Sequence, residues 1–119
     1  LDLSRLRQIS RGDRSRSMRY LRQFQELIPA RLELLELARY EEDRKTIRQV
    51  VHQMRPQLEF FGLAQLLSGL QLLEVQYRTM AWEKLTGILD KLKAILLKAL
   101  QELIAVLQFL HDHPLHTHV

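Results

Sequence analysis

Residues 43–62 read DRKTIRQVVHQMRPQLEFFG, and this stretch decides the fold class. Asp43 is a good cap for the start of a helix, and Gly62 is a good stop for its end. Between them the apolar residues recur at steps of three or four, which is typical of one buried helical face. They are Ile47, Val50, Val51, Met54, Leu58 and Phe61. We therefore predict an amphipathic helix here, packed through this face against other helices.

The same period continues on both sides of this stretch. Asp13 can cap a long helix before it, and Pro29 should kink or restart that helix. A further helix is expected over Leu63–Tyr77, where Gly69 permits close packing, and Thr79 can cap a last one that runs to Leu110.

The N-terminal end adds a shorter element. A short helix is expected from about Leu3 to Ile9, ended by Gly12, and no strand pattern occurs anywhere. The sequence thus predicts an all-α fold, an up-down four-helix bundle with an additional short N-terminal helix. We assign residues 1–110 to this bundle and residues 111–119 to a frayed, His-rich tail.

The composition limits the classes of function. With 46% hydrophobic and 27% charged residues in 119, the chain suits one folded domain. It has no Cys, which excludes disulfides, a thiolate nucleophile and a Cys-type zinc site, and it has no nucleotide-binding loop. The net charge is +4, and the excess of Arg in the first 22 residues favours anionic partners or a solvated surface. These arginines are Arg5, Arg7, Arg11, Arg14, Arg16, Arg19 and Arg22.

No signal peptide or transmembrane span is expected. The most apolar stretch, Ala94–Leu110, is interrupted by Lys98, Gln101 and Glu102, which indicates one buried face of a soluble helix. The chain begins at Leu1, so we expect a segment of a longer protein. We expect a cytoplasmic location, alone or as the cytoplasmic part of a larger hybrid sensor or regulator.

His52 lies on the polar side of the predicted helix. At about 100° per residue it falls roughly 140° from the centre of the apolar face. Lys45, Arg48, Arg55, Pro56 and Glu59 surround it. A neutral imidazole has a free ring nitrogen that can meet a phosphoryl group, and a guanidinium can hold the phosphoryl oxygens. A solvated surface His remains the alternative that the residues alone leave open.

The surrounding residues resemble the histidine phosphotransfer family. Its motif is a His, a Lys or Arg three residues later and a Gly ten residues later, as in His52, Arg55 and Gly62. The likeness extends over most of the chain. It includes Leu1-Asp2-Leu3-Ser4-Arg5-Leu6, Gly12-Asp13, the acidic turn ending in Asp43, and Leu70, Leu73 and Glu74.

The resemblance implies that His52 is the phosphoacceptor, that Arg55 supports the phosphate and that Gly62 is structural. Partners would be response-regulator receiver domains, including a receiver and kinase core in the same parent polypeptide. The receiver brings the Mg²⁺, so this domain would bind no cofactor and would be a phosphocarrier and not a self-contained enzyme. No nucleic-acid or membrane contact is expected, and the family precedent favours a monomer.

Two positions depart from the family pattern. Pro56 stands where a Gly or another small residue is common, and we predict a local kink there because proline cannot donate to the carbonyl of His52. Glu59 stands where a small residue is usual, and its carboxylate could orient the imidazole, repel a phosphoryl group or simply be solvated. These departures leave open a module that docks receivers without accepting phosphate. A basic helical adaptor for nucleic acid is a third class.

Overall fold

The computed structural model describes residues 1–4, 8 and 13–112, and within these ranges the regular structure is entirely helical. Four α-helices follow one another: α2 (Arg14–Tyr40), α3 (Arg44–Phe60), α4 (Leu67–Gln76) and α5 (Trp82–Asp112). A single 3-10 turn (Ala64–Leu66) precedes α4. The expected helix over Leu3–Ile9 and the break at Gly12 lie mostly outside the described residues, as does the tail from residue 113.

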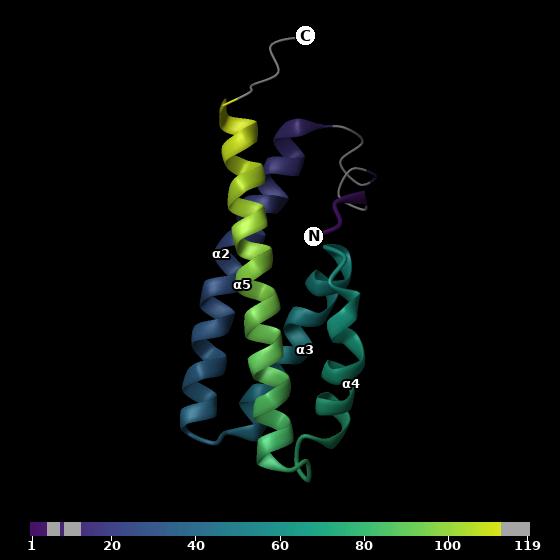
Figure 1. The fold of residues 1–119 in the computed structure, drawn as a ribbon, viewed down its shortest axis with the longest axis vertical. Coiled ribbons are helices and arrows are strands. Elements are labelled where there is room, and N and C mark those ends of the chain that lie inside the picture. The colour runs from purple at the N-terminus through teal and green to yellow at the C-terminus, as the bar shows by residue number, and fades with distance from the viewer. Residues whose placement is uncertain (5–7, 9–12, 113–119) are drawn as a thin grey trace.

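The helices lie side by side around one core (Figure 1). α2 packs against α3 and α5, and α4 packs against the same two helices from the other side. The core holds the apolar face predicted from residues 43–62, because all six of those side chains are buried. From the other helices it takes Leu21, Phe24, Ile28, Leu32, Leu35, Ala38, Leu63, Leu66, Leu70, Leu73, Met80, Leu85, Leu89, Leu92, Leu96, Ala99 and Leu103.

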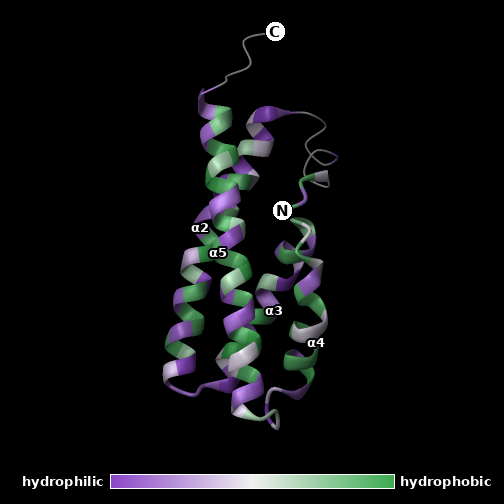
Figure 2. Cartoon of the chain, in the orientation of Figure 1, coloured by the Kyte–Doolittle hydropathy of each residue, from purple (hydrophilic) through white to green (hydrophobic). Residues whose placement is uncertain are grey.

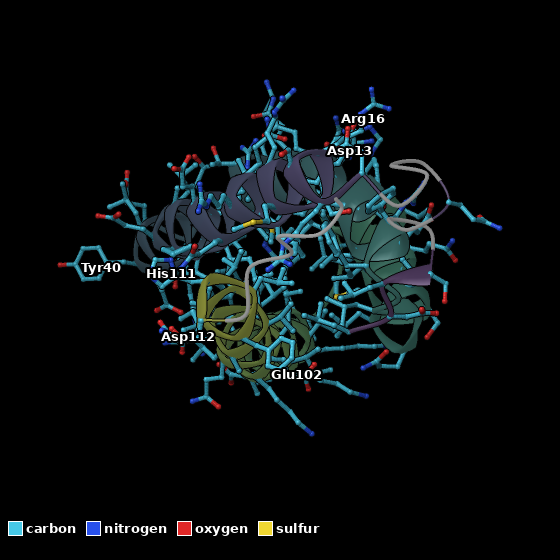
Figure 3. The ribbon with its side chains drawn as sticks, turned by 90° about the horizontal axis from the view of Figure 1, so that it is seen from above. Asp13, Arg16, Tyr40, Glu102, His111 and Asp112 are labelled. Atoms are coloured by element: carbon cyan, nitrogen blue, oxygen red, sulfur yellow. The ribbon has the colours of Figure 1, made fainter. Side chains whose placement is uncertain are left out.

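The predicted caps at Asp13 and Asp43 are confirmed. The Asp13 side chain accepts from the backbone N–H of Arg16, and Figure 3 shows the two residues together at the start of α2. The Asp43 carboxylate accepts from both the backbone N–H and the hydroxyl of Thr46. These hydrogen bonds, the hydroxyl first, lower the pKa of Asp43 below its ordinary value of 3.8 because they favour the ionised form.

The stop at Gly62 is also confirmed. Gly62 has φ +73°, and the backbone N–H of Leu63 reaches back to the carbonyl of Leu58. This pairing satisfies a carbonyl at the end of α3 and turns the chain toward α4. A Cβ at Gly62 would collide with Asp2, whose backbone N–H donates to the carbonyl of Phe61.

Several details of the helices differ from the expectations. α2 continues through Pro29 as one element of 27 residues, so the helix does not restart there, and the kink expected as the alternative stays a prediction. α5 begins at Trp82 and not at Thr79, because the Thr79 N–H still donates to the carbonyl of Gln76 in the preceding turn. α5 runs on through His111 and Asp112, two residues beyond the expected end of the last helix. The close packing expected at Gly69 does not require a glycine, because a Cβ there would lie 3.9 Å from Ile88, an ordinary packing distance.

Arg44 secures the connection between α4 and α5. Its guanidinium donates to the carbonyls of Tyr77 and Met80, at 2.9 and 2.6 Å, and lies 5.4 Å from the centre of the Trp82 ring. The first residue of α3 therefore holds the turn that leads into α5. This contact fixes the end of α4 beside α3.

α5 is less buried than its sequence suggested. Among the described helices, α5 alone is long and apolar enough in composition to cross a membrane, yet only 17% of its most apolar 18 residues are buried. Figure 2 shows apolar residues along its C-terminal half, beyond the level at which α3 ends. The expected buried face is present at Leu96, Ala99 and Leu103, whereas Leu97 and Ile104 in the same stretch are exposed.

Candidate functional site

His52 stands near the middle of α3 with its side chain 56% exposed. The prediction that its ring faces away from the core is confirmed. Its neighbours Val51 and Met54 are buried, so the backbone that carries the ring is held firmly by the core. An exposed ring on a fixed backbone is accessible to a partner without any rearrangement of the helix.

The ring is held by a carboxylate from the next helix. Glu74 Oε1 lies 2.5 Å from His52 Nδ1. An ionised carboxylate only accepts hydrogen bonds, so Nδ1 carries the proton and donates it to Glu74. The lone pair of the neutral ring then belongs to Nε2. Within the described part of the chain, no residue forms a hydrogen bond with Nε2.

Glu74 is the only polar residue among the buried side chains of the described chain, with 8% of its surface exposed. Both of its oxygens are paired, because Oε2 accepts from Arg55 Nη1 at 2.6 Å. A buried carboxylate is tolerated only when it is paired in this way. Glu74 therefore links the imidazole and a guanidinium into one fixed unit.

The packing of α4 on α3 places Glu74. Leu70 and Leu73 on α4 are fully buried against the core and set the rotation of α4 about its own axis. The turn at Gly62 brings α4 back along α3, so that residues 52 and 74 meet across the two helices. No local feature of α3 could supply this contact.

A shallow depression of about 460 Å³ lies over this unit. Its lining residues are Arg48, His52, Arg55, Gln71, Glu74 and Val75. Arg55, expected to support a phosphate, is already paired with Glu74 and half-exposed. Arg48 lines the same depression, and no hydrogen bond or ion pair within the described residues engages its guanidinium.

The other residues predicted near the site form no hydrogen bond with the His52 ring. Glu59 is exposed, and the carboxylate on the imidazole is that of Glu74, so the expected orienting role of Glu59 is wrong. Pro56 lies inside α3, which continues to Phe60 as one helix, and the expected kink stays a prediction. Lys45 is exposed at the start of α3 and does not line the depression. Gly62 lies at the end of α3, away from the ring.

In the sequence, Glu74 stands out only through the family resemblance, and its contact with His52 was not predicted. One signal was available. Glu74 is the only acidic residue between Leu63 and Trp82, in a helix that is otherwise apolar or neutral. A single carboxylate beside the buried Leu73 needs a partner, and the polar face of α3 was the nearest source of one.

No family model, curated protein sequence or solved structure matches this chain. Within the described residues, no group of three or more acidic or imidazole side chains is arranged to hold a metal ion. The described geometry offers an accessible ring nitrogen, a buried carboxylate on the opposite nitrogen and two guanidinium groups beside them. This arrangement can accept and hold a small anionic group on Nε2.

Proposed function

We propose that the chain is a histidine phosphotransfer domain, an up-down four-helix bundle that carries a phosphoryl group on His52. The observation that carries the proposal is the Glu74–His52 pair, which leaves Nε2 as the nucleophilic nitrogen on an exposed ring. The donors and acceptors of the phosphoryl group would be aspartates of receiver domains in a cytoplasmic signalling relay.

The chemical step is a transfer between two nucleophiles. The Nε2 lone pair attacks the phosphorus of an aspartyl phosphate, the N–P bond forms, and the P–O bond to the aspartate breaks. The receiver recovers its carboxylate, and the imidazole ring gains positive charge while Nδ1 keeps its proton. The reverse step delivers the phosphoryl group to another receiver aspartate.

Glu74 would stabilise the charge that develops in this step. Its carboxylate lies against Nδ1 before the reaction and is held there by Arg55, so it needs no reorganisation as the ring becomes cationic. Its burial also keeps water from screening the interaction. The same hydrogen bond fixes the ring orientation, which directs the phosphoryl group to Nε2.

The two arginines would then have different tasks. Arg55 neutralises and positions Glu74, with one guanidinium nitrogen at 2.6 Å from Oε2. Arg48 has an unengaged guanidinium in the depression and can receive the phosphoryl oxygens. The domain would contribute the nucleophile and this cationic support, and the receiver would contribute the metal ion and the remaining catalytic groups.

A transfer assay tests the proposal. The chain is incubated with a receiver domain phosphorylated by acetyl phosphate, and a radioactive label stable in alkali but labile in acid is expected on the chain. His52→Gln should abolish the label, whereas His111→Gln, a matched change of an exposed His on α5, should leave it unchanged. A label that survives His52→Gln would reject the site.

Receiver binding without any label would instead support the docking module suggested by the departures at Pro56 and Glu59. Titration of the receiver by calorimetry, run beside the transfer assay, separates the two functions. Binding that falls steeply with salt and prefers DNA over the receiver would support the nucleic-acid adaptor and reject the relay.

A further inference from the structure

α5 carries a second row of apolar side chains besides the one buried in the core. Leu97, Leu100, Ile104 and Leu107 follow one another at steps of three, four and three. Leu97 is 42% exposed and Ile104 is 47% exposed, and the other two are half-buried. This spacing is that of a seam along which two helices pair.

Four exposed positions of α5 beside this row are uncharged, although Lys98 and Glu102 are exposed in the same stretch of the helix. Ala94, Gln101, Ala105 and Gln108 are exposed along α5 and are all neutral. Two of the four are alanines, which let a neighbouring helix approach closely. These four positions and the apolar row together form what we call the α5 face.

α2 runs antiparallel to α5 beside this face. Arg39 donates to Asp90 at 2.6 Å, and Lys93 lies 3.5 Å from Glu36, so the C-terminal half of α2 accompanies the N-terminal half of α5. The hydrogen bond with Asp90 is the main reason why the pKa of Arg39 is raised. These contacts fix the register of the two helices.

The exposed charges of α2 change sign along its length. Arg16, Arg19 and Arg22 are exposed in its N-terminal part, which contains no acidic residue before Glu26. Glu33 and Glu36 are exposed in its C-terminal part. A helix with this polarity is complementary to a second copy of itself running in the opposite direction, and repels one running in the same direction.

We propose that the α5 face, together with α2, is the contact surface of an antiparallel homodimer. A two-fold axis perpendicular to the helices, at the height of residue 102 along α5, sets Leu97 of one copy opposite Leu107 of the other and Leu100 opposite Ile104. In the same arrangement Arg22 of one copy approaches Glu33 of the other. One operation thus satisfies both the apolar row and the charge polarity of α2, in contrast to the monomer that the family resemblance favours.

The dimer leaves both His52 sites open. His52 lies on α3 beside α4, and the α5 face lies on the α2–α5 side, away from that helix pair. Formation of the dimer therefore does not depend on phosphoryl transfer. Because the row from residue 97 to residue 107 is only about 15 Å long, the interface is small, and we expect a reversible dimer that dissociates on dilution.

Sedimentation equilibrium of the full chain over a wide concentration range tests this proposal. The expected result is a mass that rises from one copy to two as the concentration increases. Replacing Leu97 and Ile104 together by Glu should keep the chain monomeric throughout, since four added charges would then meet at the interface. Val75→Glu, an 81% exposed apolar position on α4, is the matched control and should leave the dimer unchanged. Circular dichroism checks that each variant is folded.

A charge exchange tests the antiparallel direction. Arg22→Glu and Glu33→Arg should each weaken the dimer several-fold, and the double variant should restore it, because the pair is then reversed as a whole. A parent chain that is monomeric at every concentration overturns the proposal. If that monomer also co-sediments with anionic lipid vesicles, the α5 face binds a membrane surface and not a second copy. A dimer that survives the Leu97 and Ile104 changes also overturns it.

Discussion

The carboxylate of Glu74 on α4 lies 2.5 Å from Nδ1 of His52 on α3, and its second oxygen binds Arg55. One buried acidic residue therefore fixes the orientation, the tautomer and the electrostatic surroundings of the exposed ring. The hydrogen bond joins two helices that are separated by a turn, so the properties of the ring depend on how those helices pack.

Changes at Glu74 should slow the proposed phosphoryl transfer to His52 without removing the acceptor. Glu74→Ala is expected to reduce the rate of label transfer by roughly 10- to 100-fold, the usual effect of losing a residue that orients a functional imidazole. Glu74→Gln should fall between Ala and the parent, because its amide oxygen still accepts from Nδ1 but carries no charge. Rapid-quench kinetics measures the rates, and nitrogen NMR of the ring reports the tautomer.

Glu59→Gln is the matched control for these variants. Glu59 is an exposed carboxylate on the same helix as His52 and does not bind the ring. The rate of label transfer to Glu59→Gln should equal that of the parent chain. If the transfer rate fell as much in Glu59→Gln as in Glu74→Gln, the assignment of Glu74 as the residue that orients His52 would be contradicted.

Arg48 and Arg55 should both matter, for different reasons. Arg48→Ala is expected to slow the transfer by roughly 10- to 150-fold, since a hydrogen bond to a charged group contributes about 1.5–3 kcal/mol. Arg55→Ala should slow it at least as much and also disturb the ring NMR signals, because Glu74 loses its partner. Lys45→Ala, a cation on α3 outside the depression, should have no effect. Equal losses at all three positions would indicate only a general dependence on positive charge.

Two glycines should respond in opposite directions to the same substitution. Gly62→Ala should destabilise the fold by roughly 1–2 kcal/mol or more, because φ is +73° and the new Cβ would meet Asp2. Gly87→Ala should stabilise it by roughly 0.5–1 kcal/mol, because Gly87 is within α5 and a Cβ there has open space around it. Urea unfolding followed by circular dichroism measures both, and a stabilised Gly62→Ala chain would contradict the described turn.

The cap at Asp43 should make the stability of the fold depend on pH in the acidic range. The pKa of Asp43 is lowered below 3.8 in the folded chain, chiefly by the Thr46 hydroxyl and then by its backbone N–H. Its stabilising contribution is therefore present above about pH 3.8 and is lost as the pH falls through the lower folded value. Asp43→Asn keeps a cap but cannot titrate, so the urea midpoint should fall less steeply below about pH 4 than in the parent. An unchanged slope would show that the cap does not couple to protonation.

The sequence by itself determined where α3 lies and which way it faces. The cap at Asp43, the stop at Gly62 and the apolar period between them are local signals, since each depends on hydrogen bonds or burial within a few residues. The same period placed His52 on the side away from the core, which the exposed ring confirms. Local chemistry was sufficient for these features.

Only the tertiary structure decided which groups meet His52 and which apolar residues stay uncovered. Glu74 is 22 residues from His52 in the sequence, and the contact depends on the rotation and register of α4, which the packing of Leu70 and Leu73 sets. Likewise, the pattern of Ala94–Leu110 predicted an apolar helix but not that Leu97 and Ile104 would lie outside the core. A helical period gives the direction of a side chain about its own helix, whereas its neighbours are fixed by how whole helices pack together.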